Sequence, residues 1–290
     1  NLTINVDIDN DGAETLTVGV SPTAAQTIYN GSNNNDSLIG PNSDTTWTIT
    51  ANNTGTLAGN GFNNFTNLTG GNLDDTFTFS GNGGLTGVLD GGAHDDGDTA
   101  NYSALGAQVI DLGGNAGGVT RIENITGNAN QTLLGAANNQ SWTINGGNDG
   151  NVVDATTLTT VTFTDFGNLT GGGGADTFIF ASGGTIGGQI NGGGGADIVD
   201  YDTNNIGGIT VTLGVTFINV ETLKGERTTL VGSPNGNTVW NLNAGSGGTA
   251  NNTTFSNVTT IRNGNGLNTY TANGSYSGTV NLTLDNNTWN

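Results

Sequence analysis

The segment NLTGGGGADTFIF (Asn168–Phe180) contains the two patterns on which the fold prediction rests. A glycine-rich run typical of a turn is followed by a short alternation of apolar and β-branched residues typical of a strand. The same combination returns as INGGGGADIVD (Ile190–Asp200), and in degraded form as NLTGGNLDDTFTF (Asn67–Phe79). The sequence therefore predicts strands that are separated by glycine-rich turns and recur along the chain.

The spacing of apolar residues in these segments predicts how the strands stack. Leu169, Ile190 and Val211 are each 21 positions apart, and so are Trp47, Leu68, Leu89 and Ile110. An apolar residue at a fixed interval, mostly followed by glycine, is typical of coils that stack and bury a continuous core. We therefore expect an all-β, elongated parallel β-helix (β-solenoid) with coils of about 20–21 residues. Helix is nearly excluded, because no segment has a clean period of 3.6 residues and glycine is frequent.

A longer repeat groups these coils. Trp47 in TWTIT, Trp142 in SWTIN and Trp240 in VWNLN each open a similar succession of segments. This spacing predicts repeats of about 100 residues within one continuous solenoid, with each Trp filling the same core position. The expected parts are an N-terminal strand and turn segment (1–35), repeat 1 (36–130), repeat 2 (131–227) and a partial repeat 3 (228–290).

Composition and charge exclude several classes of partner. The chain has 24 Asp and Glu against 4 Lys and Arg, which gives a formal net charge of −20, and it has no cysteine. Nucleic acids and anionic membrane surfaces need basic residues that this chain lacks. No apolar run approaches the length that spans a bilayer, so we expect no membrane insertion. The start at Asn1, without Met or signal-peptide features, indicates a processed product or a segment of a longer chain.

Calcium is the one cofactor that the motifs suggest. GGGGADTFI (Gly171–Ile179) and GGGGADIVD (Gly192–Asp200) match the calcium-binding nonapeptide of β-rolls, and GGNLDDTFT (Gly70–Thr78) matches it in part. Carboxylates and backbone carbonyls are the oxygen ligands that Ca²⁺ prefers. A glycine-rich turn in which the Asp forms a hydrogen bond to the backbone would produce the same sequence motif. DIDNDGAE (Asp7–Glu14) begins like an EF-hand loop but lacks the closing Glu. The candidate metal ligands are therefore Asp7, Asp9, Asp11, Asp75, Asp176 and Asp197.

These motifs also carry a family resemblance. The order W-x-I, N-L-T-G-G-x-G-x-D-x-F-x-F, a G-x-I-x-G-G turn and I-E-N-I-T-G resembles the tandem repeats of giant secreted bacterial surface proteins, the RTX-like and filamentous-haemagglutinin-like β-solenoid adhesins. The resemblance covers residues 36–290 well and 1–35 poorly. It implies secretion to the cell surface, an elongated stalk or filament, and stiffening by calcium.

The sequence argues against an enzyme. Catalytic β-helices need clustered carboxylates, often with Lys, Arg or His, and His94 is the only histidine. Asp74–Asp75 and Asp95–Asp96 belong to a repeated turn, so we expect them to have a structural role rather than to act as paired catalytic acids. We expect no catalytic residue, and a polysaccharide lyase or hydrolase is the least favoured alternative.

Two binding alternatives stay open, together with one mode of assembly. A carbohydrate-binding adhesin stalk would present aromatic side chains to surface glycans. Thr-x-Thr rows are similar to ice-binding faces, but their irregular spacing in the sequence argues against the flat array that such faces need. NLTLDNN (Asn281–Asn287) is similar to NLTINVDIDN (Asn1–Asn10), so we expect self-association end to end, or contact with neighbouring repeats of a longer chain.

Overall fold

The computed structural model describes residues 2–6, 12–19, 27–32, 35–93, 97–204, 208–282 and 287–289, with Glu226 and Arg227 described by their backbone alone. These residues form strands, turns and bends and no helix, which confirms the all-β prediction. Within this described part there is accordingly no helix with the length and apolarity to cross a membrane. The chain divides into two compact units: unit 1 comprises 1–136 and 160–166, and unit 2 comprises 137–159 and 167–290.

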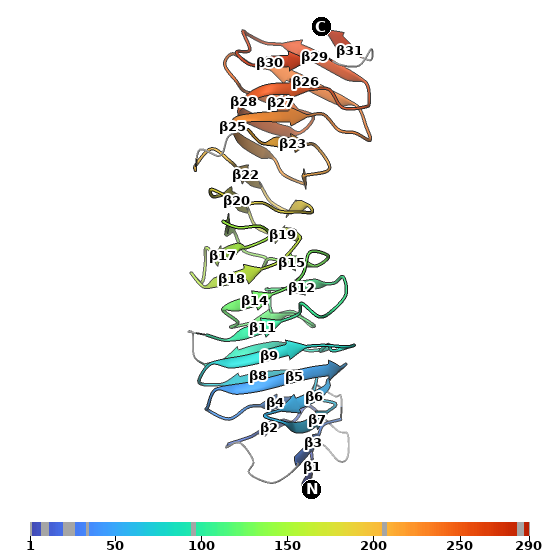
Figure 1. Cartoon of the computed structure of the whole chain (residues 1–290), viewed down its shortest axis with the longest axis vertical. Coiled ribbons are helices and arrows are strands. Elements are labelled where there is room, and N and C mark those ends of the chain that lie inside the picture. Colours follow the sequence, from blue (N-terminus) through green and yellow to red (C-terminus); the bar gives the residue numbers. More distant parts are fainter. Residues whose placement is uncertain are drawn as a thin grey trace. The chain divides into compact units, whose positions relative to one another are not determined.

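Unit 1 is built from short strands joined by turns (Figure 1). Its strands are β1 (Leu2–Asn5), β2 (Thr15–Thr17), β3 (Thr27–Asn30), β4 (Ser37–Ile39), β5 (Thr45–Ala51), β6 (Thr54–Leu57), β7 (Asn60–Asn63), β8 (Asn67–Gly71), β9 (Asp75–Phe79), β10 (Leu89–Gly92), β11 (Thr99–Asn101), β12 (Val109–Asp111), β13 (Val119–Thr120), β14 (Asn124–Thr126), β15 (Thr132–Leu134) and β18 (Thr160–Thr164).

Two rows of parallel strands in unit 1 bring distant parts of the sequence side by side. One row pairs β2, β4, β8, β10 and β13 in that order. The other pairs β5, β9, β11, β14 and β18 in that order. Leu68 aligns with Leu89, at the predicted interval of 21. Trp47, however, aligns with Phe77, and Leu89 with Val119, so the interval is not constant.

The reason for the varying interval is that strand register and turn length are set independently. A slip of one residue would turn the buried side chains of a strand to the outside, so the apolar residues fix the register. Turns on the surface tolerate insertions at small cost. The predicted period of 21 residues holds between Leu68 and Leu89, but its extension to Trp47 and Ile110 is wrong. Its extension from Ile190 to Val211 is wrong as well, because Ile190 aligns with Phe217.

Unit 2 repeats the arrangement. Its strands are β16 (Gln140–Ile144), β17 (Gly150–Asp154), β19 (Asn168–Gly172), β20 (Thr177–Phe180), β21 (Ile190–Gly193), β22 (Ile198–Asp200), β23 (Thr210–Thr212), β24 (Phe217–Ile218), β25 (Thr222–Val231), β26 (Thr238–Leu242), β27 (Gly248–Ala250), β28 (Thr253–Arg262), β29 (Asn268–Ala272), β30 (Thr279–Asn281) and β31 (Asn287–Trp289). Parallel pairing again links β16, β20, β22, β25, β28 and β30 in that order. Leu169 aligns with Ile190, as the sequence predicted.

An antiparallel hairpin interrupts the parallel pattern after each of the three Trp residues. Trp47 pairs with Leu57, Trp142 with Val152, and Trp240 with Ala250. These hairpins were not predicted, because their turns contain the same Gly and Asn residues as the other turns. All three Trp side chains are fully buried, which confirms their predicted core position.

Aromatic stacks fill the core between neighbouring strands. Trp47 stacks on Phe77 with ring centroids 5.4 Å apart, and Trp142 stacks on Phe178 at 5.5 Å. Both stacks arise because the alternation of residues turns every second side chain inward. Burying these rings supplies a large share of the apolar area of a thin core.

Candidate functional site

A column of carboxyl groups lies inside unit 1, at the point where successive strands begin. The backbone N–H of Asp75 donates a hydrogen bond to Oδ1 of Asp98 over 2.7 Å. The backbone N–H of Asp98 in turn donates to Oε2 of Glu123 over 2.9 Å. Each acid therefore satisfies the backbone of the equivalent corner one pass earlier in the chain. We call these three side chains, and their counterparts in unit 2, the corner carboxyls.

Unit 2 contains the same column. Gln140 donates its backbone N–H to Oδ1 of Asp176 over 2.7 Å, and Asp176 donates to Oδ1 of Asp197 over 2.8 Å. Asp197 then donates to Oε2 of Glu221 over 2.8 Å. The corner carboxyls are thus Asp75, Asp98, Glu123, Asp176, Asp197 and Glu221.

The local sequence explains why the acids occupy these corners. A buried backbone N–H costs free energy unless it finds an acceptor, and a carboxyl group is a strong acceptor. Asp75 also accepts the N–H of Gly71 on Oδ2 over 2.6 Å, which closes the turn that precedes β9. The side chain of Asp75 thus closes its own turn, while its backbone N–H bonds to the next pass of the chain.

Glycine is required where the turn passes the carboxyl group. A Cβ placed on Gly171 would lie 2.3 Å from Oδ2 of Asp176 and 2.4 Å from the carbonyl oxygen of Gly192. A Cβ on Gly192 would lie 2.5 Å from Oδ2 of Asp197. The first residue of the GGGGAD motif must therefore be glycine, because the carboxyl group of the Asp at the end of the motif occupies the space of a Cβ.

Burial changes the acidity of the corner carboxyls. Asp75 and Asp176 are fully buried, and Asp197 is 1% exposed. The pKa of Asp75 is raised to about 7, chiefly by burial and also by the neighbouring Asp98, against the opposing hydrogen bond from Gly71. Burial likewise raises the pKa of Asp176 to about 7, with Asp197 adding to the effect. The pKa of Asp197 is raised by burial and by Glu221.

The corner carboxyls meet the needs of calcium only in part. Ca²⁺ takes six to eight oxygen ligands. Asp75, Asp176 and Asp197 each direct one carboxyl oxygen at a backbone N–H. The Oδ2 atoms of Asp176 and Asp197 are buried and have no hydrogen-bond partner among the described residues. The described residues also contain no group of three or more His, Cys, Asp or Glu side chains that could hold a metal ion. Calcium binding at these three residues stays a prediction.

The structure does not describe most of the other candidate residues named from the sequence. Asp7, Asp9 and Asp11 lie outside the described residues, as do His94, Asp95 and Asp96. Asp74 is exposed whereas its neighbour Asp75 is fully buried, so the two carboxyls face opposite ways and do not form a catalytic pair.

Half of the corner carboxyls were not predicted from the sequence. Asp98, Glu123 and Glu221 were not among the predicted ligands, because they do not stand in a complete GGxGxD motif. What the six corner carboxyls share is a simpler signal: each is the first residue of a strand or immediately precedes one. A search for an acid that directly precedes a β-branched or Asn residue at the start of a strand would have identified all six.

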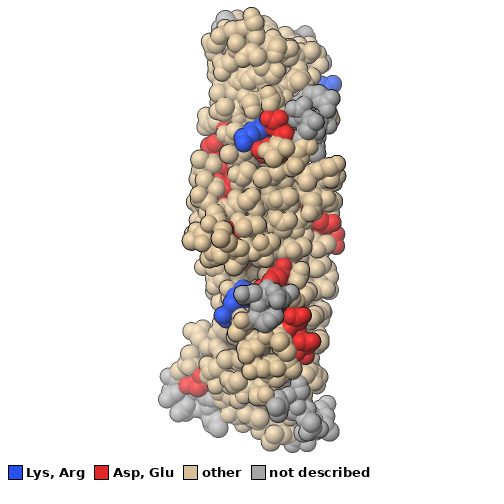
Figure 2. All heavy atoms as spheres, turned by 90° about the vertical axis from the view of Figure 1, so that its left-hand side faces the viewer, with Lys and Arg blue, Asp and Glu red and all other residues tan. Residues whose placement is uncertain are grey.

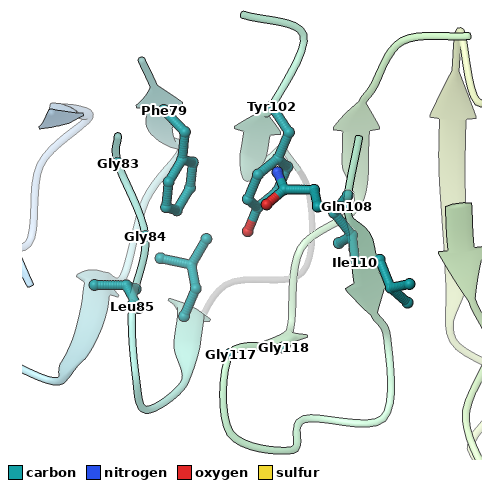
Figure 3. A pocket seen from close by; sticks show the side chains of 11 residues that line it. Phe79, Gly83, Gly84, Leu85, Tyr102, Gln108, Ile110, Gly117 and Gly118 are labelled. Carbon is teal, nitrogen blue, oxygen red and sulfur yellow. The ribbon is translucent and has the colours of Figure 1, made fainter. Parts of the chain in front are cut away.

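A cavity of about 210 Å³ lies elsewhere in unit 1, and Figure 3 shows the side chains around it. Phe79 and Tyr102 form one wall, stacked with ring centroids 4.3 Å apart. Nε2 of Gln108 is buried and has no hydrogen-bond partner among the residues that the structure describes. No lining residue is charged. The cavity therefore suits a small neutral molecule that can accept a hydrogen bond.

The surface carries less charge than the composition indicates. Most of the face in Figure 2 consists of uncharged residues, with acidic and basic side chains in small groups. Arg121 forms an ion pair with Asp90, and Lys224 with Asp200 at 3.2 Å. Many of the acids are buried instead, namely Asp36, Asp75, Asp98, Asp154, Asp176, Asp197 and Asp200. The formal charge of −20 therefore overstates the attraction of this surface for cations.

Comparisons with protein-family models, with curated proteins and with solved structures gave no match for this chain.

Proposed function

We propose that the chain is a parallel β-solenoid that serves as a non-enzymatic structural or adhesive element outside the cell. The observation that carries this proposal is the column of corner carboxyls, which joins successive passes of the chain in both units. Solenoids in which every coil contacts only its neighbours are extended and stiff. The resemblance of the repeats to secreted bacterial adhesins supports a place at the cell surface.

Length and stiffness follow from how the coils are joined. Strands such as β9 and β11, or β20 and β22, pair in parallel with the next pass, and the corner carboxyls add hydrogen bonds from backbone N–H groups. Bending such a stack would break ladder bonds and expose the aromatic stacks at the same time. The residues that recur in every copy therefore serve packing, and we propose no catalytic group.

Self-association end to end is part of this proposal. β1 pairs with β3 and β31 pairs with β29, and no strand in the described part of the chain covers the other edge of either. Leu2 on β1 is 53% exposed, and Trp289 on β31 is 51% exposed. An open edge with apolar side chains is a template for another strand. We propose that an identical chain, or a neighbouring repeat of a longer chain, covers these edges.

Light scattering and negative-stain imaging over a concentration series test the assembly. We expect oligomers that lengthen with concentration, and we expect Trp289→Lys to reduce them. Val109→Lys is the matched control, because Val109 is similarly exposed on a different strand. Monomers at every concentration would reject association of identical chains and favour contact within a longer chain. Equal loss in both variants would show that the edge of β31 is not the contact.

The cavity next to Tyr102 favours a second function, that of a glycan-binding stalk. Its neutral lining, aromatic wall and free amide donor suit a sugar ring better than an ion. Glycan-array binding that is lost in Gln108→Leu would support this function, and absence of binding to every glycan would reject it. Calcium remains a proposed cofactor, with Asp7, Asp9 and Asp11 as its other candidate ligands.

A further inference from the structure

The outward side of one row of strands in unit 1 is a regular array of threonine. The strands are β5, β9, β11, β14 and β18, which pair in parallel in that order. Their inward residues are buried: Trp47, Phe77, Ala100, Ile125 and Phe163. The residues on either side of these point outward in two columns. One column is Thr46, Thr76, Thr99, Asn124 and Thr162, and the other is Thr48, Thr78, Asn101, Thr126 and Thr164. We call these ten residues the threonine face.

The face is regular although the sequence is not. All four strand pairings in this row are in register, with no bulge or shift. Asp75 and Asp98 are 23 residues apart and Asp98 and Glu123 are 25 apart, so the turns absorb the differences in length. The objection from irregular sequence spacing therefore does not hold for this row. Parallel strands lie about 4.8 Å apart, and alternate residues along a strand are about 6.6 Å apart. The array thus has two fixed repeat distances at right angles.

The chemistry of the face is uniform and uncharged. Eight of the ten residues are Thr, each with a methyl group beside a hydroxyl group. The hydroxyl of Thr99 donates to the carbonyl oxygen of Gly97 at 3.3 Å, and no such bond to a described residue is seen for the other seven. β-Branched side chains have few rotamers in a strand, so both groups are held in place. Thr46, Thr76, Thr162 and Thr164 are exposed, and the others are half-buried. Of the two Asn residues, Asn101 turns its Oδ1 to the backbone N–H of Ser103 at 3.0 Å.

A surface of this kind complements a periodic lattice of water. Methyl groups that repeat at fixed distances hold water in ordered cages, and hydroxyl groups between them anchor that water by hydrogen bonds. Both repeat distances of the array are close to spacings in hexagonal ice. A polysaccharide would instead be bound by outward aromatic rings or by long polar side chains. None of the ten residues of the threonine face is of either kind, apart from the two short Asn side chains.

We propose that the threonine face binds the surface of ice through water ordered on its methyl and hydroxyl groups. This activity is separate from the solenoid's structural role, because it uses only outward residues of one row of strands. It would make ice one of the surfaces to which the chain adheres.

Capture of the purified chain by slowly growing ice tests the proposal. We expect several-fold more of the chain in the ice than of a non-binding control protein, and inhibition of ice recrystallisation in the same samples. Thr78→Tyr places a bulky ring near the middle of the face and should lower capture several-fold. Thr69→Tyr is the matched control, because Thr69 is an outward, half-buried residue of β8 in the other strand row of the same unit. Capture of the control should equal that of the unchanged chain.

Melting curves show whether each variant is folded. If Thr78→Tyr is unfolded, Thr78→Val keeps the shape and removes the hydroxyl, and it should still lower capture. Capture no greater than that of the control protein would overturn the proposal. So would equal loss in Thr78→Tyr and Thr69→Tyr, or retention on insoluble cellulose or chitin without retention in ice.

Discussion

The backbone N–H of Asp176 donates a 2.8 Å hydrogen bond to Oδ1 of Asp197, 21 residues further along the chain. Both side chains are buried, and the strands that follow them, β20 and β22, pair in parallel. The bond lies at the corner where each pass of the chain enters its strand. It gives the Asp of the GGGGAD motif a structural role at this corner.

Removing the acceptor should destabilise unit 2. In Asp176→Ala the buried N–H of Gln140 loses its partner, which costs about 1–3 kcal/mol. Asp176→Asn keeps an oxygen at the same place and should cost much less. Urea unfolding of the two variants measures the difference. Equal stability of the Ala and Asn variants would show that the bond contributes nothing.

The first glycine of the motif should be sensitive to a single methyl group. Gly171→Ala places a Cβ 2.3 Å from Asp176 and 2.4 Å from the backbone of Gly192, so the corner must shift or open. We expect a loss of about 1–3 kcal/mol, as for other overpacked sites. Gly194→Ala is the control, because the nearest atom to its Cβ is 4.0 Å away. A melting temperature that falls equally in both variants would contradict the packing argument.

Stability should fall as the pH rises from about 4 to about 7. An unfolded Asp has a pKa of about 3.9, whereas the folded pKa of Asp75 and of Asp176 is about 7. In this window the folded chain holds protons that the unfolded chain has released, so raising the pH disfavours the folded state. The pKa values of Asp154 and Asp200 are lowered, although burial alone would raise them, because hydrogen bonds from Thr157 and Thr203 outweigh it. Those two groups act in the opposite direction, below about pH 4.

Thermal unfolding between pH 4.5 and 8 measures this dependence. Asp75→Asn removes one titrating group and should flatten the curve, while Asp74→Asn, at the exposed neighbour, should leave it unchanged. A melting temperature that is constant or rises with pH would show that the buried carboxyls are ionised in the folded chain throughout.

Calcium at the corner of Asp176 has a direct test. Oδ1 of Asp176 accepts a backbone N–H, while its Oδ2 is buried and has no hydrogen-bond partner among the described residues. If calcium binds at this corner, it should raise the melting temperature, and the rise should disappear in Asp176→Asn. A rise that persists in this variant would place the metal elsewhere, and no rise at all would reject calcium as a cofactor.

The strands and the buried Trp residues could be predicted because their signals are local. The alternation in DTFTF around Phe77 fixes a strand and its inward face whatever the rest of the chain does. The alignment of Trp47 with Phe77 could not be predicted, because it depends on how long each turn is. The antiparallel hairpin that follows Trp47 escaped prediction for the same reason.

The candidate site was predicted in part. Asp75, Asp176 and Asp197 were found through their glycine motif, which predicted either a calcium ligand or a hydrogen-bonded turn. The hydrogen bond from the N–H of Asp75 to Asp98 joins residues 23 apart, and no pattern within one turn reveals it. The threonine face was discounted for the same kind of reason, since its regularity exists only after the strands are paired.

Small-angle X-ray scattering of the purified, dilute chain tests the proposed stacking of parallel coils most directly. A solenoid whose coils follow one another along a single axis predicts the scattering of a rod. The distance distribution should have one peak at the width of a coil and a long, nearly linear decline to the maximum dimension. A symmetric, bell-shaped distribution with a short maximum dimension would contradict the solenoid and the mechanical role built on it.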